Sequence, residues 1–282
     1  MNLFSMESSF PAANSVLRFL ESHDTCRKTL WERLFAGTYD KPFIVDSGRY
    51  RFLHFDLDAV QSAMELDDPE QLSLTYTRKM MTFLLFNSQP SRILLLGLGG
   101  GSLAKFCYRR LPHTALTAVE GNPDVIALRG EFQVPPDNGR FRIYCDDGAR
   151  YVARLGLIKD MILADACDRT GVAPALGTLE FYQHAYRGLS SRGLSSRGVF
   201  VGNLCGDTDC AAHLTKIRTI FADNVVTLPI APDGNIIVFA FKGPRPDVSG
   251  DSVLAHALRL SRRFRLDFAR YVQRLSPHFT NP

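Results

Sequence analysis

A glycine-rich turn constrains the fold of this chain more than any other feature. The apolar run Arg92–Leu96 ends at this turn, which contains Gly97, Gly99 and Gly101, and a stretch with helical spacing follows. Glycine suits such a turn because a Cβ would hinder positive φ angles and hold the backbone away from a ligand. Free N–H groups at the start of the helix would face the same ligand. The order of strand, glycine turn and helix predicts the first unit of a nucleotide-binding α/β sheet.

A second apolar run supports this interpretation. Ala115–Val119 begins about 20 residues after the first strand and is followed by Glu120. A carboxylate at the end of a second strand can accept hydrogen bonds from both hydroxyls of a ribose. Ser102 stands where dinucleotide-binding proteins have a third glycine, so the nucleotide need not be a dinucleotide.

Composition narrows the class of protein. The chain is 45% hydrophobic and 22% charged, which is ordinary for a water-soluble globular protein. No apolar run approaches the ~20 residues that a membrane span requires, and the first residues do not resemble a secretory signal. The six cysteines show no C-x-x-C pairing. We therefore expect a cytoplasmic protein with reduced thiols, no membrane segment and no metal.

Charge is distributed unevenly along the chain. The formal net charge is +4, and Lys242–Pro282 holds eight Lys and Arg against three Asp. This basic end predicts an amphipathic helix with a solvated arginine face, and nucleic-acid binding is not expected because no aromatic stacking motif accompanies the arginines. The stretch Phe52–Thr77 carries six Asp and Glu and no Lys or Arg. It is either a site that attracts a cation or a solvated hairpin and loop.

The first part of the chain predicts a small domain of helices and a β-hairpin. Ser9–Phe35 has helical spacing and predicts one or two short helices. From Lys41 to Leu57, apolar residues alternate around the turn Asp46–Gly48, which indicates a hairpin. Helical spacing returns over Leu72–Phe86. We expect residues 1–88 to form this domain.

Residues 89–245 alternate strands with helices, which is typical of parallel βαβ construction. The predicted strands are 92–98, 115–120, 141–145, 161–164, 198–203, 225–229 and 235–241. The gap between the last two is too short for a helical crossover, so this pair should be antiparallel. We predict an α/β fold with a class I methyltransferase-like Rossmann sheet, closed by an antiparallel pair. Residues 246–282 are expected to form a C-terminal basic helix.

Carboxylates follow successive predicted strands beyond Glu120. Asp147 comes after the third strand, and Asp165 and Asp168 come after the fourth. In an open parallel sheet, ligands lie beyond the carboxyl ends of the strands, so these groups should converge on one cleft. Asp147 can accept from an adenine amino group. Asp165 can take a proton from an incoming amine or orient it, and Asp168 can hold a substrate cation.

Residues 40–245 resemble the polyamine aminopropyltransferases, the family that includes spermidine synthase. The residues that carry the resemblance are Ala59–Gln61, Tyr76, Gly97–Gly101, Val119–Glu120, Asp147–Gly148, the D-x-x-D motif of Asp165 and Asp168, Thr178–Tyr182 and Gly198–Val201. The resemblance implies a transferase that moves an aminopropyl-type alkyl group from decarboxylated S-adenosylmethionine to a small-molecule amine and leaves methylthioadenosine. It also implies a homodimer formed through the N-terminal hairpin domain.

The resemblance assigns roles to individual residues. Those assigned to the adenosyl part of the donor are Gln61, Gly97, Gly99, Gly101, Glu120, Asp147 and Gly148. Asp165 is implied to be the proton acceptor, and Tyr76 and Asp168 are implied to contact the amine. No metal is implied.

Other residues depart from the family pattern. The family turn reads G-G-G-D-G, and the place of its Asp is taken by Gly100. The usual Tyr-His-Glu is Tyr76-Thr77-Arg78, so we expect Arg78 to bring a positive charge near a site for ammonium groups. The adenosyl half of the site is kept, whereas the polyamine half has changed. Two alternatives stay open: a methyltransferase that uses intact S-adenosylmethionine, and a non-catalytic nucleoside-binding homologue.

Overall fold

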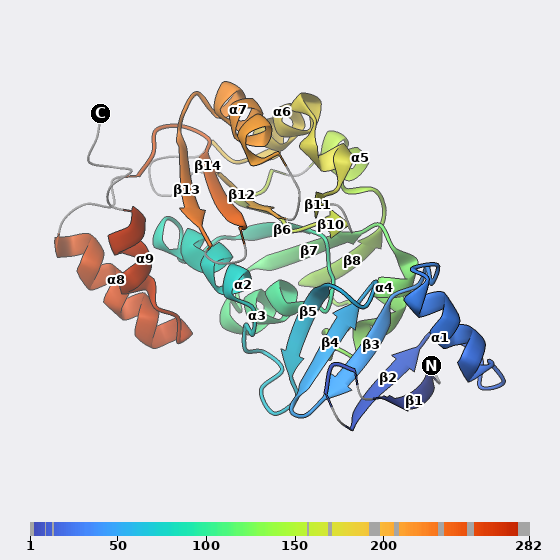
Figure 1. Cartoon of the computed structure of the whole chain (residues 1–282). Coiled ribbons are helices and arrows are strands. Elements are labelled where there is room, and N and C mark those ends of the chain that lie inside the picture. The colour runs from blue at the N-terminus through green and yellow to red at the C-terminus, as the bar shows by residue number, and fades with distance from the viewer. Residues whose placement is uncertain are drawn as a thin grey trace.

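Two β-sheets with helices around them make up the molecule (Figure 1). The computed structural model describes residues 3–8, 10–12, 14–156, 158–168, 171–191, 198–205, 209–230, 234–246 and 251–275, with the side chain of Asp168 left out. One sheet has five strands and the other has seven, and a separate short hairpin lies between strands of the larger sheet along the chain.

The N-terminal sheet is antiparallel throughout, with its strands in chain order. They are β1 (Phe4–Ser8), β2 (Ser15–Phe19), β3 (Phe43–Ser47), β4 (Tyr50–His54) and β5 (Val60–Glu65), and helix α1 (Arg27–Phe35) follows β2. The apolar side of α1, with Leu30 and Leu34, packs in one cluster with Phe19 and Phe43. The predicted hairpin is therefore confirmed as β3 and β4.

The prediction of helix throughout Ser9–Phe35 is wrong in its first half. Ser15, Leu17 and Phe19 are buried and alternate with half-buried residues, which is the two-residue period of a strand. Apolar residues at Val16, Leu17 and Leu20 also fit a helical spacing, so the short segment was ambiguous until its pairing with β3 was known. The acidic stretch Phe52–Thr77, which is expected to be either a cation-attracting site or a solvated hairpin and loop, contains the end of β4 and all of β5.

The seven-stranded sheet has the predicted class I methyltransferase-like arrangement. Its order is β13-β14-β12-β9-β6-β7-β8, in which β8, β7, β6, β9 and β12 are parallel. The added pair is antiparallel, as expected from its short connection. The bounds are β6 (Arg92–Leu96), β7 (Ala115–Glu120), β8 (Phe141–Cys145), β9 (Met161–Ala164), β12 (Val199–Leu204), β13 (Val225–Pro229) and β14 (Ile236–Phe241). The short hairpin consists of β10 (Cys167–Asp168) and β11 (Gly171–Val172).

Helices cover both faces of this sheet because alternate residues of β6 point to opposite sides. Ile93 and Leu95 pack in the cluster that includes α3, α8 and α9, whereas Leu94 and Leu96 pack with α5, α6 and α7. The helices are α2 (Thr75–Met80), α3 (Ser102–Arg110), α4 (Pro123–Ala127), α5 (Gly148–Ala153), α6 (Leu179–Gly188), α7 (Cys210–Phe221), α8 (Asp251–Phe264) and α9 (Phe268–Leu275). Short 3-10 helices span Met81–Leu85, Leu128–Gly130 and Pro174–Gly177.

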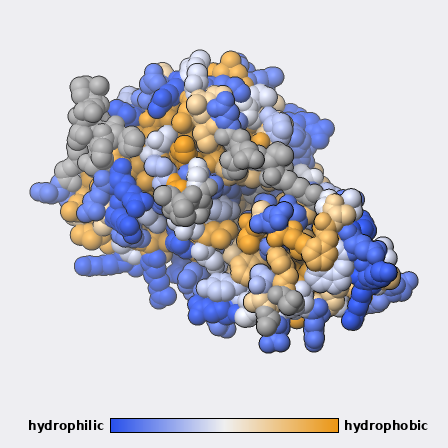
Figure 2. All heavy atoms as spheres, viewed as in Figure 1, coloured by the Kyte–Doolittle hydropathy of each residue, from blue (hydrophilic) through white to orange (hydrophobic). Residues whose placement is uncertain are grey.

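The C-terminal region forms two helices where one was predicted. Arg265, between α8 and α9, has a φ of +57°, and a residue in this conformation ends a right-handed helix. Phe264 and Phe268 on either side are buried against the larger sheet, while Arg259, Arg262 and Arg263 are exposed. Figure 2 shows hydrophilic and hydrophobic residues side by side on the surface of this helical pair. The division of the chain at residues 88 and 245 stays a prediction.

The cysteines differ from the expectation of reduced thiols. Cys167 and Cys205 form a disulfide, and Cys26, Cys107, Cys145 and Cys210 are free. The bonded pair is 38 residues apart, and only the adjacency of β9 and β12 brings its members together. In the part of the chain that the structure describes, none of the helices has the length and apolar character needed to cross a bilayer.

Candidate active site

Two adjoining cavities open at the carboxyl ends of the parallel strands. We call them the Asp147 cavity, with a volume of about 490 Å³, and the Asp165 cavity, with a volume of about 620 Å³. The residues that line both are Phe55, Gly97, Glu120, Ala166 and Cys167. The groups at the strand ends therefore converge as predicted, but they line two cavities that share a wall.

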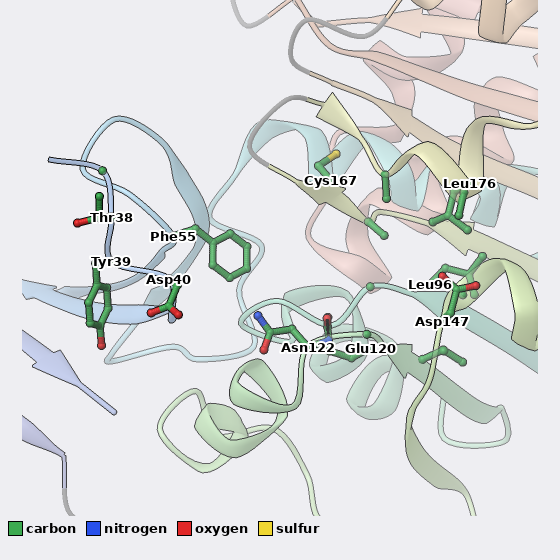
Figure 3. A pocket seen from close by; sticks show the side chains of 18 residues that line it. Thr38, Tyr39, Asp40, Phe55, Leu96, Glu120, Asn122, Asp147, Cys167 and Leu176 are labelled. Carbon is green, nitrogen blue, oxygen red and sulfur yellow. Dashed lines mark hydrogen bonds between the residues drawn. The ribbon is translucent and has the colours of Figure 1, made fainter. Parts of the chain in front are cut away.

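The Asp147 cavity receives side chains from both sheets (Figure 3). Glu120 and Asn122 come from the end of β7, and Asp147 comes from the end of β8. Asp40 lies in the loop between α1 and β3, and Phe55 lies just after β4, so the N-terminal part supplies one side of the cavity. Its exposed lining is mainly apolar, which suits a flat aromatic ring with a few polar attachments.

The glycine turn brings two strand ends into close contact. Gly97 has a φ of +91°, and a Cβ there would lie 2.2 Å from the carbonyl oxygen of Asp165. Gly101 has a φ of +70°, and a Cβ there would lie 2.3 Å from Cγ2 of Val134. Both positions need glycine, because backbone conformation and available space exclude a side chain.

Glu120 is held by the backbone on both of its oxygens. The N–H of Leu98 donates to Oε2 at 2.8 Å, and the N–H of Asn122 donates to Oε1 at 2.9 Å. A carboxylate oxygen can accept more than one hydrogen bond, so each oxygen keeps capacity for a ligand hydroxyl. The side chain lines both cavities at a fixed position. This arrangement suits the two neighbouring hydroxyls of a ribose.

Asp147 is fixed by the helix that it precedes. It is the N-cap of α5, and its Oδ1 accepts from the N–H of Arg150 at 2.7 Å. Gly148 is the first residue of α5, where a Cβ would lie 3.3 Å from Cδ2 of Leu176. Leu176 forms part of the cavity wall beside them. Asp147 and Gly148 thus line the cavity where the sequence predicted an adenine contact.

Asp165 occupies the wall of the second cavity, directly after β9. Nδ2 of Asn203 donates to its Oδ1 at 3.0 Å, and the hydroxyl of Tyr76 donates to the same carboxylate. Burial raises the pKa of Asp165 to about 6, although both hydrogen bonds favour the ionised form and oppose this increase. Nδ2 of Asn235 in turn donates to Oδ1 of Asn203 at 3.2 Å. A carboxylate with this pKa is ionised at neutral pH and remains able to accept a proton.

Tyr76 acts as a hydrogen-bond donor in this group. Burial and the nearby charge of Asp165 raise the pKa of the Tyr76 phenol well above its ordinary value, so the hydroxyl keeps its proton. Gln61 and Ser62 line the same cavity. Gln61 therefore lies on the Asp165 side of the shared wall, apart from Asp147. The side chain of Asp168 lies outside the described part of the chain.

The position of Gly100 is closed to a side chain. A Cβ there would lie 2.9 Å from Cδ1 of Phe132 and 2.9 Å from Cβ of Ser62. The N–H of Gly100 donates to Oγ of Ser62 at 2.9 Å. Phe132 and Ser62 thus fill the space that the side chain of the family's Asp would need.

Arg78 lines neither cavity, so the structure gives no support to the expectation that it brings a positive charge near the amine site. Its Nη1 donates to the carbonyls of Leu72 and Ser73, both at 2.7 Å. Residues two apart on a helix point in different directions, so Arg78 turns away when Tyr76 faces the cavity. Thr77 is buried, and its hydroxyl donates to the carbonyl of Leu74 at 2.7 Å.

Several lining residues were not predicted from the sequence. Asn203 ends the fifth predicted strand, so the strand-end rule that found Asp147 and Asp165 could have found it as well. Phe55, Asp40 and Ser62 gave no such signal because they come from the other sheet. The described residues include no group of three or more His, Cys, Asp or Glu suited to a metal ion.

Comparison with known proteins decides the family. No protein-family model matches the chain. A polyamine aminopropyltransferase of Chromobacterium violaceum is 39% identical over 234 residues, which cover 82% of this chain and 88% of that protein. The chain belongs to the polyamine aminopropyltransferase family. A polyamine aminopropyltransferase of Neisseria meningitidis serogroup B is 37% identical over 230 residues, which cover 80% of the chain and 86% of the relative.

Solved structures support the fold of this family member. A spermidine synthase in complex with the transition-state analogue AdoDATO has a TM-score of 0.60 at 22% identity, covering 86% of this chain and 83% of that one. Human methyltransferase-like protein 13 in complex with SAH has a TM-score of 0.60 at 24% identity, covering 68% of this chain and 93% of that one. The resemblance and the predicted class I methyltransferase-like sheet are both confirmed.

Proposed function

We propose that this aminopropyltransferase takes the aminopropyl group of decarboxylated S-adenosylmethionine and transfers it to a small-molecule amine. The observation that carries the proposal is the placement of Asp165. Asp165 has a pKa of about 6 and lines one cavity. The adjoining cavity, across a shared wall, offers groups suited to a nucleoside. Named relatives of the same family act as polyamine aminopropyltransferases.

The residues that line the Asp147 cavity fit an adenosyl group. Glu120 has both oxygens fixed by backbone N–H groups and would accept from the ribose hydroxyls. Asp147 would accept from the adenine amino group, with Leu176 against the ring. Gln61 would contact the donor from the Asp165 cavity. Gly97, Gly99 and Gly101 would let the backbone approach the ligand, and Asp168 is proposed as a further contact to the amine.

The reaction follows from these positions. The amine nitrogen attacks the carbon next to the sulfonium sulfur, the carbon–sulfur bond breaks, and its electron pair stays on sulfur to give neutral methylthioadenosine. An amine with a pKa of ~10 arrives protonated at neutral pH, so a proton must be removed for attack. The ionised carboxylate of Asp165 accepts that proton. Asn203 and Tyr76 hold the carboxylate in place throughout.

A methyltransferase is the second candidate, and Gly100 is the observation that favours it. Where the family has an Asp, Phe132 and Ser62 occupy the space, so this position offers no carboxylate to hold a transferred amine or to repel the carboxylate of intact S-adenosylmethionine. Calorimetric titration with decarboxylated S-adenosylmethionine, S-adenosylmethionine and methylthioadenosine separates the candidates.

The expected ranking places the decarboxylated donor at least about tenfold tighter than S-adenosylmethionine, a difference of about 1.4 kcal/mol. Tightest binding of S-adenosylmethionine, together with methyl transfer, would favour the methyltransferase. Binding of methylthioadenosine without turnover of any amine would indicate a non-catalytic homologue.

We also infer a homodimer through the N-terminal sheet. A cytoplasmic location stays a prediction, because the disulfide of Cys167 and Cys205 removes reduced thiols as an argument for it. Phe35 on α1 is 76% exposed and stacks on Trp31, which leaves an apolar surface on this part of the molecule. Analytical ultracentrifugation of the native chain and of Phe35→Ser tests the dimer. Cell fractionation tests the location.

A further inference from the structure

A disulfide that the proposed reaction does not use lies in the wall of the site. Cys167 follows Asp165 by two residues, and Cys205 follows Asn203 by two. Both cysteines line the Asp165 cavity, and Cys167 also lines the Asp147 cavity. The bond therefore joins the two segments that carry the proposed proton acceptor and its amide partner.

The links between the two segments follow one another in the same order along β9 and β12: first the backbone ladder, then a hydrogen bond, then the disulfide. β9 and β12 are parallel neighbours whose register ends at the pair of Ala164 and Gly202. One residue further along each strand, Asn203 donates to Asp165. Two residues beyond that, the sulfur atoms are bonded. The disulfide thus continues the connection between the strands past the end of the backbone ladder.

Both cysteines line a cavity from which a small thiol could approach them. Cys167 and Cys205 are both half-buried, and Figure 3 shows the side chain of Cys167 beside the Asp147 cavity. A thiolate that enters a cavity can attack a disulfide in its wall, because exchange depends on access to a sulfur atom. A ligand that fills the cavity would block the same approach.

We propose that Cys167 and Cys205 form a thiol–disulfide exchange site that responds to low-molecular-weight thiols, and that its oxidation state sets the affinity for the amine. A thiolate such as that of glutathione attacks one cysteine sulfur, the disulfide bond breaks, and the other sulfur leaves as a thiolate that takes a proton. A second glutathione thiolate then attacks the mixed disulfide. The protein gains two thiols, and two glutathione molecules become oxidised glutathione; the reverse steps restore the bond.

We expect reduction of the disulfide to affect the Asp165 cavity more than the Asp147 cavity. Cys167 begins the hairpin of β10 and β11, so reduction removes the covalent link between this hairpin and the end of β12. The β9–β12 ladder, the Asp165–Asn203 hydrogen bond and the contacts of β11 with β12 remain. Glu120 is fixed by backbone N–H groups that reduction does not touch. The second part of the proposal rests on the proposed function: reduction raises the KM for the amine at least about fivefold and changes nucleoside affinity less than about twofold.

The first experiment counts thiols and measures their protection, with no need for turnover. After incubation with oxidised glutathione and denaturation, alkylation should label four of the six cysteines, and after full reduction it should label all six. Methylthioadenosine should slow the reduction of the native chain by glutathione. Six labelled cysteines after oxidation, or a reduction rate that saturating nucleoside leaves unchanged, would overturn the exchange site.

The second experiment compares variants. Cys167→Ser/Cys205→Ser should show the same amine KM in reduced and oxidised glutathione, whereas Cys210→Ser, which removes a free cysteine of α7, should respond like the native chain. A native KM that is equal in both redox states, as verified by thiol counts, contradicts the proposed control. If no form turns over any amine, the proposed function fails, while the thiol counts and the nucleoside protection still decide the exchange site. Circular dichroism verifies that each variant folds.

Discussion

The two cavities are built by different kinds of contact. In the Asp147 cavity, backbone N–H groups fix the acceptors: two hold Glu120, and the start of α5 holds Asp147. In the Asp165 cavity, side chains from distant segments fix the carboxylate, namely Asn203 and Tyr76, with a disulfide nearby. Backbone contacts follow from a strand-end motif and survive most substitutions. Side-chain contacts depend on several distant residues, so a single substitution can remove them.

The largest effect is expected at Asp165. Asp165→Asn keeps the size of the side chain but removes the proton acceptor, so turnover should fall by about 10²–10⁴. The affinity for methylthioadenosine should change little, because Glu120 and Asp147, which are proposed to hold the ribose and the adenine, keep their backbone contacts. Single-turnover kinetics and calorimetry on the same variant give both values. Full activity of Asp165→Asn would show that Asp165 is not the proton acceptor.

The second effect concerns the backbone-fixed acceptor. Glu120→Ala should weaken nucleoside binding by about 1–3 kcal/mol, because the ligand loses a charged acceptor. Glu120→Gln should lose less, since it keeps a carbonyl oxygen. Glu180→Ala, which removes an exposed carboxylate outside both cavities, is the matched control. Equal affinity for methylthioadenosine in all three variants would remove Glu120 from the ribose site.

The third effect tests whether the residues packed around Gly100 leave no room for a side chain at this position. Gly100→Ala should lower the free energy of unfolding by about 1–3 kcal/mol, because its Cβ would meet Phe132 and Ser62. Gly130→Ala is the control, since no atom lies within 4 Å of its added Cβ. Urea denaturation of both variants measures the difference. Equal stability would mean that the neighbours move aside and that an acidic side chain could be restored there.

The smallest effect concerns the pH at which activity begins to fall. The pKa of Asp165 is about 6, so kcat/KM should decrease as the pH drops below this value and the carboxylate becomes protonated. Asn203→Leu removes a hydrogen bond that favours the ionised form, so the pKa should rise and the acid limb should move to higher pH.

Asn235→Ala is the graded control for this pH effect. Asn235 reaches Asp165 only through Asn203, so its loss should move the acid limb less, in the same direction. Profiles of kcat/KM between pH 5 and pH 8 compare the variants with the native chain. An acid limb that stays in place in Asn203→Leu would exclude Asp165 as the group that titrates.

Local patterns determined the larger sheet and the carboxylates at its strand ends. The glycine turn, the carboxylates at strand ends and the short gap before β14 each depend on neighbours in the chain, so the sequence shows them directly. Only the tertiary structure decided that Ser15–Phe19 is a strand, that Arg78 turns away, and that Cys167 meets Cys205. Only the tertiary structure likewise showed that Asn203 and Tyr76 donate hydrogen bonds to Asp165. These features depend on which segments become neighbours in space, and strand pairing and core packing over long separations determine that, not local periodicity.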